Sequence, residues 1–261
     1  MTETSSETLV RLDVDDAIAT ITLDSPANRN ALSRRLLVEL VAHLATARDD
    51  ASVRGVVLTA TGTTFCSGAD LSDPPGRGEA SSVALPEILT EMWRYPKPIV
   101  VRLNGHVRAG GIGLVAAADI VVAPLSATFA FTEVRIGVIP AVISATVLPR
   151  LAPRAAAELL LTGDQFDARR AVEVGLVTAA VSAAELDQTV DRYARALLRA
   201  APGALAGTKE LLRKPDGPAL RARLAELTEL SVRYFTSDEG REGITALLGK
   251  RDPAWVNPPS P

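Results

Sequence analysis

The stretch NGHVRAGGIGLVAAADI, residues 104–120, contains the strongest structural signal in the sequence. An apolar strand at residues 99–103 leads into Asn104-Gly105, and the small residues from about 111 to 118 then predict a helix. The glycine turn between strand and helix exposes bare backbone N–H groups. Because the helix dipole adds positive charge at the same point, the turn favours an anion or a developing oxyanion held close to the backbone.

Two nucleotide-binding patterns overlap this turn. Residues 105–112 space two glycines as a P-loop does, but the segment ends in Gly-Ile where that loop needs Lys followed by Ser or Thr. Residues 111–116 satisfy G-x-G-x-x-A, the dinucleotide pattern, with the acidic Glu133 at about the right distance. A strand-like piece at 128–131 lies between them, which that pattern does not include. In a purely structural alternative, the glycines let helix and sheet pack closely.

The second informative stretch is TFCSGADLS, residues 64–72, which follows a strand that ends near Thr59. This position places a loop at the carboxyl edge of a sheet, where α/β folds bind ligands. Asp70 is a candidate catalytic carboxylate, although capping a turn is the commoner use of such a residue. Cys66 has no basic neighbour to lower its pKa and is expected to be a packed thiol, and Ser67 is not in a G-x-S-x-G elbow.

The remainder of the chain alternates strands and helices up to Pro140 and then becomes helical. Residues 9–14 and 17–23 alternate apolar with polar around Asp15-Asp16, as in a hairpin, and Ser33 is a plausible N-cap for a helix reaching about Asp49. This order predicts an α/β core with right-handed crossovers. Further strands are expected at 53–59, 99–103 and 120–122, a helical stretch up to Tyr95, and helices at 155–161, 168–174, 183–199, 204–212 and 220–234.

Composition excludes several classes of protein. The 261 residues carry 28 Lys+Arg and 31 Asp+Glu, a formal charge of −3, which gives no electrostatic case for a nucleic-acid partner. One cysteine and two histidines make a disulfide framework or a metal cluster improbable, so no metal site is expected. The polar, acidic start and the lack of an apolar run of about 20 residues predict a cytoplasmic protein with no membrane partner.

Several motifs follow one another along the chain: PANRNALS (26–33), FCSGADL (65–71), YPKPIVVRLNG (95–105), AGGIGL (109–114), ATFAFTEVRIGVIP (127–140), LTGDQFDARRAVEVGLV (161–177) and REGITALLGKR (241–251). In this order they resemble the motifs of the crotonase superfamily, the enoyl-CoA hydratase/isomerase family. The resemblance implies a spiral of ββα units and a CoA thioester whose carbonyl oxygen is held by two backbone N–H groups. It further implies a core at residues 1–200 and a C-terminal helical region at 201–261 that covers the site or mediates trimerisation, in a homotrimer or a dimer of trimers.

Matched residue by residue, the resemblance places the two N–H donors at Ala69 and Gly110. One such donor is worth about 10²–10³ in rate in known oxyanion holes. CoA is expected only as part of the thioester substrate, with no permanently bound cofactor. Phe235 matches a position that contacts CoA from a C-terminal helix, of the same or a neighbouring subunit, although a core aromatic is the favoured interpretation of this residue. The full set of expected CoA contacts is Arg29, Ala31, Ser67, Ala69, Asp70, Leu71, Gly110 and Phe235.

The acid/base equipment departs from the usual pattern of hydratases, which have two glutamates. The first position is Gly113 in this chain, and the second is Glu133, between apolar Phe131 and Val134, where burial would raise its pKa. One carboxylate can add water across the C2=C3 bond of a 2-enoyl-CoA, or can move a proton between C4 and C2 as in Δ3,Δ2-enoyl-CoA isomerases. Hydration is the favoured interpretation, and a non-catalytic acyl-CoA-binding homologue is the third.

Residues 141–144, Ala-Val-Ile-Ser, are a further departure, because many relatives have a glycine-rich run there. The segment resembles those of relatives that hydrate branched or dicarboxylic enoyl-CoAs. The bulkier Val142 and Ile143 are expected to reshape the acyl pocket.

Overall fold

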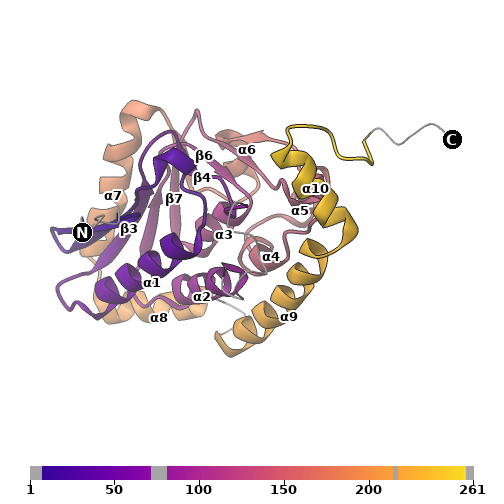
Figure 1. Ribbon diagram of the computed structural model, residues 1–261. Helices are drawn as coiled ribbons and strands as arrows, with labels where there is room; N and C mark the ends of the chain where they lie inside the picture. Colours follow the sequence, from indigo (N-terminus) through magenta and orange to yellow (C-terminus); the bar gives the residue numbers. More distant parts are fainter. Residues whose placement is uncertain (1–7, 72–80, 214–216, 257–261) are drawn as a thin grey trace, which may run out of the picture.

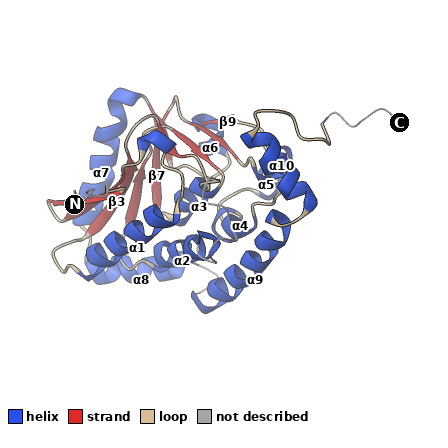
Figure 2. Cartoon of the chain, in the orientation of Figure 1, coloured by secondary structure: helices blue, strands red, loops and turns tan. Residues whose placement is uncertain are grey.

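A computed structural model describes residues 8–71, 81–213 and 217–256 of the chain. Two sheets lie at its centre with helices packed around them, and the C-terminal helices run along one side of the molecule (Figure 1; Figure 2). The larger sheet has the order β1-β2-β3-β5-β7-β10, and the smaller has the order β4-β6-β8-β9. The strands are β1 Val10–Asp15, β2 Ile18–Leu23, β3 Gly55–Ala60, β4 Thr64–Cys66, β5 Ile99–Arg102, β6 His106–Arg108, β7 Ile120–Pro124, β8 Thr128–Ala130, β9 Phe166–Asp167 and β10 Ala179–Val181.

The chain alternates between the two sheets. Strands β3, β5 and β7 belong to the larger sheet, and each is followed at once by β4, β6 or β8 of the smaller sheet and then by a helix. Within each sheet these strands pair in parallel. The expected spiral of ββα units is therefore confirmed, and its turns place the carboxyl ends of β4 and β6 side by side.

The period of two along the strands separates the two faces of the larger sheet. On β3, Val56 and Leu58 point into the main core, whereas Val57 belongs to a smaller cluster with Leu186 and Val190 of helix α7 (Leu186–Leu198). Helix α7 thus covers the outer face, and the main core lies between the inner face and the other helices.

Most of the predicted helices are present. Ser33 caps the first of them by accepting a hydrogen bond from Leu36 N at 3.3 Å, as its N-cap position predicts. The α-helices are α1 Arg34–Asp49, α2 Ser81–Arg94, α3 Gly110–Ala117, α4 Ala141–Val147, α5 Pro153–Thr162, α6 Ala168–Glu173, α7 Leu186–Leu198, α8 Pro202–Leu212, α9 Gly217–Phe235 and α10 Asp238–Leu248, and the 3-10 helices are η1 Pro26–Asn28, η2 Glu133–Ile136 and η3 Ala183–Glu185.

Helices α9 and α10 pack against the body of their own chain. Helix α9 lies against α2 and α4, and α10 lies against η2 (Figure 1). A Cβ on Gly243 of α10 would come within 2.2 Å of Ile136 O, so only glycine permits this close approach to η2. No helix in the three described ranges is long and apolar enough to span a bilayer.

Several short elements differ from the sequence prediction. Strands β9 and β10 lie in the region for which the sequence pattern predicts helices alone, because two or three residues are too few to show a period of two. Strands β4 and β6 and helices α4 and α10 were also not predicted, and α3 begins one residue earlier, at Gly110.

Candidate active site

The loop after β4 lies beside the loop that precedes α1. Leu32 donates its N–H to Gly68 O at 2.8 Å and accepts from Asp70 N at 3.5 Å, which forms a parallel bridge between Leu32 and Ala69. Buried Asn30 fixes the start of this arrangement, since its Nδ2 donates to the carbonyl oxygens of Thr61 and Thr64 at 3.0 and 2.8 Å. The loop is thus held by backbone bonds and by one amide.

Two backbone N–H groups at this edge have no acceptor in the described part of the chain. The bridge uses the polar groups of Leu32, so the N–H of Ala69 points away from it. Gly110 is the first residue of α3, and its N–H therefore has no acceptor within the helix. The two groups are neighbours, because a Cβ placed on Gly110 would lie 3.9 Å from Ala69 N.

Backbone strain aims the Gly110 donor. Ala109, immediately before it, has φ 43° and ψ −120°, a conformation that L-residues rarely adopt. Its N–H donates to Ala130 O at 3.1 Å, which fastens the turn to β8. Strain of this kind costs about 1–3 kcal/mol and clusters at functional sites.

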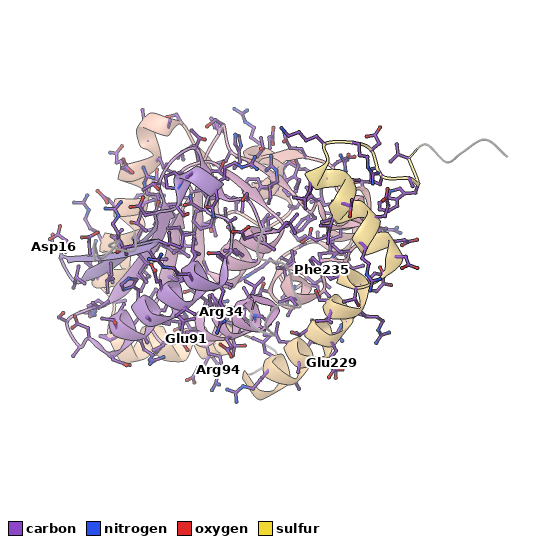
Figure 3. The ribbon with its side chains drawn as sticks, viewed as in Figure 1. Asp16, Arg34, Glu91, Arg94, Glu229 and Phe235 are labelled. Atoms are coloured by element: carbon purple, nitrogen blue, oxygen red, sulfur yellow. The ribbon has the colours of Figure 1, made fainter. Side chains whose placement is uncertain are left out.

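Both N–H groups open into one cavity of about 380 Å³. Its volume lies in the range typical of small-molecule sites, and its walls are mostly aliphatic. Figure 3 shows Phe235 at the junction of α9 and α10, and it lines this cavity from the same chain. The described polar lining consists of Ser67, Asp70, Thr132, Glu133, Arg135 and Ser231, and the apolar lining includes Leu32, Leu71, Leu85, Val138, Ile139, Val142, Ile143 and Leu247.

Glu133 is the buried acid of the cavity. It begins η2, its side chain is only 8% exposed, and its Oε2 has no hydrogen-bond partner among the described residues. Burial raises the pKa of Glu133 to about 7, against a smaller lowering by its own backbone N–H. Asp70, the other acid in the described lining, is half-buried. Glu133 can therefore exchange a proton near neutral pH.

The structure brings together most of the predicted site residues. Glu133, Ala69, Gly110, Ser67, Asp70, Leu71 and Phe235 all line the one cavity. Arg29 and Ala31 are not among its described lining residues. Arg29 is exposed, with φ 59°, and its carbonyl accepts from Ser67 N at 3.1 Å, so it lies beside the loop rather than in the cavity. Phe235 is half-buried at the cavity, which contradicts the favoured interpretation as a core aromatic.

Two residues that shape the site, Asn30 and Ser231, have no role assigned from the sequence, although Asn30 lies within the PANRNALS motif. Asn30 has φ 54°, and an asparagine in a turn-rich stretch is one of the few residues that tolerates this conformation. Ser231 is 8% exposed and lines the cavity from α9. It continues the apolar spacing of Leu220, Leu224 and Leu227, so a small polar residue at a core position was the available signal.

The opposite end of α3 is tied into a buried charged cluster. Arg150 donates to the carbonyl oxygens of Ala116 and Ala118 at 3.0 and 2.9 Å, and Arg213 donates to that of Ala117 at 3.0 Å. These carbonyls are the unpaired acceptors at the helix C-terminus, where cations are favoured.

Asp119 completes this cluster. Its carboxylate pairs with Arg213 and, at 2.6 Å, with Lys209 Nζ, and it accepts from Ile99 N at 2.8 Å. Burial alone would raise the pKa of Asp119, but the two cations of α8 and its C-cap outweigh this effect and hold the pKa below its usual value. The guanidinium groups of Arg150 and Arg213 lie over the Trp93 ring, 5.3 and 4.5 Å from its centroid.

No group of three potential metal ligands occurs in the residues that the structure describes. The site consists instead of backbone donors, one buried carboxylate and an aliphatic cavity.

Comparison with known proteins agrees with this fold. The family model described as Enoyl-CoA hydratase/isomerase matches residues 13–258. An enoyl-CoA hydratase from Mycobacterium avium has a solved structure with a TM-score of 0.85 and 42% identity, covering 96% of this chain and 100% of its own. The Escherichia coli K12 2,3-dehydroadipyl-CoA hydratase is 30% identical over 89% of this chain and 92% of its own, and the carnitinyl-CoA dehydratase of the same strain is 31% identical over 92% and 95%.

These similarities define an enzyme with the crotonase fold. The chain belongs to the enoyl-CoA hydratase/isomerase family.

Proposed function

We propose that this enzyme adds water across the C2=C3 bond of a 2-enoyl-CoA thioester. The observation that carries the proposal is the buried Glu133 carboxylate, whose Oε2 has no hydrogen-bond partner among the described residues, in the same cavity as the N–H groups of Ala69 and Gly110. One side supplies a base and acid, and the other supplies donors for an oxygen that gains negative charge.

The reaction proceeds in two proton movements through Glu133. Its carboxylate takes a proton from water while the water oxygen bonds to C3, and the electrons of C2=C3 move toward the thioester carbonyl. The N–H groups of Ala69 and Gly110 stabilise the resulting enolate oxygen. The protonated Glu133 then gives its proton to C2, which regenerates the thioester carbonyl and the carboxylate. A pKa of about 7 suits both steps, because neither form of Glu133 is costly at neutral pH.

Isomerisation between 3-enoyl and 2-enoyl thioesters is the second candidate, since the described cavity offers one buried acid and a proton shuttle from C4 to C2 needs no more. The relatives favour hydration: one is named a 2,3-dehydroadipyl-CoA hydratase and another a carnitinyl-CoA dehydratase. A dehydratase catalyses the reverse chemistry and needs the same groups.

The CoA part of the substrate is proposed to bind along the loops at the cavity mouth. Ser67 and Leu71 would contact the adenine end, and exposed Arg29 beside this loop would attract the phosphates. Phe235 would contact CoA from the same chain. We further propose a cytoplasmic enzyme that acts as a homotrimer or a dimer of trimers and needs no resident cofactor.

The deciding experiment is mass spectrometry of products in deuterated water, with crotonyl-CoA and 3-hexenoyl-CoA as separate substrates. The expected result is addition of one D2O to crotonyl-CoA. Deuterium uptake and double-bond movement in 3-hexenoyl-CoA without added water would establish the isomerase instead. No change in either thioester would overturn hydration of simple enoyl-CoAs and would favour an acyl-CoA-binding protein.

A further inference from the structure

Behind the cavity wall, Ile143 makes a contact with Gly113 that only glycine allows. A Cβ placed on Gly113 of α3 would lie 2.6 Å from Ile143 Cγ2, 3.1 Å from Ile143 Cβ and 3.5 Å from Leu89 Cδ2. Real Cβ atoms do not approach other carbons as closely as 2.6 Å, so the Ile143 side chain fills the space that any side chain at position 113 would need.

A buried hydroxyl fixes this contact. Thr146, one turn after Ile143 on α4, donates through Oγ1 to Gly113 O at 3.1 Å and to Ile143 O at 3.2 Å. Thr146 is fully buried, so its hydroxyl has little alternative to these acceptors. Helices α3 and α4 are therefore held at a fixed separation at this point, so a larger residue at position 113 can be accommodated only if the Ile143 side chain shifts toward the cavity.

Ile143 is also close to where the thioester carbonyl would lie. Gly113 follows Gly110 by three residues, which is about 4.5 Å along a helix axis. Ile143 lines the same cavity as Gly110 and Glu133, and it is 3% exposed. Its side chain thus faces the first carbons of an acyl group whose carbonyl oxygen contacts Gly110 N.

We propose that Ile143, seated on Gly113, sets the width of the acyl pocket beside C2 and C3 and so determines whether a methyl branch there is accepted. The inference rests on the proposed function for the orientation of the acyl chain. It predicts that substitutions of Ile143 and of Gly113, the two residues in contact, change the width of the pocket in opposite directions. Removing atoms from Ile143 widens the pocket, and adding a methyl group at Gly113 pushes Ile143 into it.

The test measures binding of two saturated thioesters that cannot be hydrated, butyryl-CoA and the methyl-branched isovaleryl-CoA, by calorimetry. In Ile143→Ala, affinity for isovaleryl-CoA relative to butyryl-CoA is expected to rise about tenfold, since one methyl group in an apolar pocket is worth about 10–200-fold at most. In Gly113→Ala the ratio is expected to fall by a similar factor, and the double variant is expected to return toward the wild-type ratio.

Val147→Ala is the matched control. Val147 lies on the same helix and is fully buried, but it is not among the described residues that line the cavity. It is expected to lose stability without changing the ratio. Because each ratio is taken within one protein, a partly unfolded sample does not distort it, and the milder Ile143→Val is expected to move it in the direction of Ile143→Ala.

Two failures are distinguishable. If both thioesters bind and the ratio is the same in wild type, Ile143→Ala and Gly113→Ala, the inference about Ile143 is wrong while the proposed function stands. If neither thioester binds to the wild-type enzyme, the proposed function fails as well.

Discussion

The two ends of helix α3 differ in whether the rest of the molecule provides hydrogen-bond partners for their backbone groups. At its start, the N–H of Gly110 is left without a described acceptor and the preceding Ala109 is strained. At its end, the last carbonyls are bound by the guanidinium groups of Arg150 and Arg213, beside the half-buried Asp119. All eight residues of the helix are buried, so both of its ends lie within the protein. An unsatisfied, reactive end is thus tolerated where the opposite end is firmly held.

The largest effect on activity is expected at the start of α3, which we call the open end because the Gly110 N–H has no described acceptor there. Glu133→Gln removes the proton carrier that faces the free N–H groups but keeps the shape of the side chain. Turnover of a 2-enoyl-CoA is expected to fall by about 10²–10⁴, with thioester binding retained, because general acid–base catalysis contributes this much. Steady-state kinetics together with calorimetric Kd values checks both parts.

The matched control is Glu229→Gln, on the exposed face of α9 (Figure 3). It is expected to leave both kinetics and binding unchanged. A fall in turnover of less than tenfold in Glu133→Gln would remove Glu133 from the mechanism.

The other end of α3, which we call the closed end, is the one bound by Arg150 and Arg213. A change there is expected to lower the free energy of unfolding. Asp119→Ala leaves Lys209 and Arg213 buried without their carboxylate, and breaking a buried pair in this way costs about 3–5 kcal/mol. Urea unfolding measures the loss. Asp187→Ala, which removes an exposed partner of Arg102, is expected to cost no more than about 1 kcal/mol. Equal losses in the two variants would mean that the cluster does not hold the helix.

A third expectation concerns the effect of Glu133 on the pH dependence of stability. Since burial raises the pKa of Glu133 from 4.5 to about 7, the folded protein holds its proton more tightly than the unfolded chain does. The resulting stabilisation is fully present below pH 4.5 and is lost as pH rises through 7. Its full size is about 3 kcal/mol, at 1.36 kcal/mol per unit of pKa.

Urea titrations at pH 5, 6, 7 and 8 on wild type and Glu133→Gln isolate this contribution as the difference between the two proteins. The variant is expected to gain stability relative to wild type as pH rises. The rate of hydration by wild type is expected to rise over the same interval, because the carboxylate is the form that takes a proton from water. A constant difference in stability across pH would contradict the raised pKa.

The smallest effects on stability are expected from adding a methyl group at Gly111, in the closely packed helix α3, and at Gly207, in helix α8. A Cβ on Gly111 would lie 2.6 Å from Cys66 Cβ, so Gly111→Ala is expected to cost about 1–3 kcal/mol through overpacking. Gly207 of α8 has nothing within 4 Å of such an atom, and Gly207→Ala is expected to stabilise the protein by about 0.4–1 kcal/mol. Thermal unfolding of both variants distinguishes them by sign.

The same contrast explains what the sequence could predict. The open end of α3 has a local sequence pattern, glycines that follow a strand. The motifs around it are enough to indicate the family and to predict that Ala69, Gly110 and Glu133 belong to one site. The closed end is not local, since Lys209 and Arg213 are 90 and 94 residues away from Asp119. Nothing in a short pattern indicates that such ordinarily exposed residues are buried. Helix α4 was missed for a related reason, because seven residues rich in Val, Ile and Thr do not distinguish helix from strand.

Cys66 provides a way to measure how fast the structure around the open end of α3 opens. It is the protein's single cysteine, it is fully buried beneath Gly111, and burial raises its pKa to about 12. Since only a thiolate reacts with an alkylating reagent, labelling must wait for β4 and α3 to separate. The labelling rate of unmodified enzyme therefore reports how often β4 and α3 separate. A thioester that binds only while they are packed together slows labelling in proportion to its occupancy.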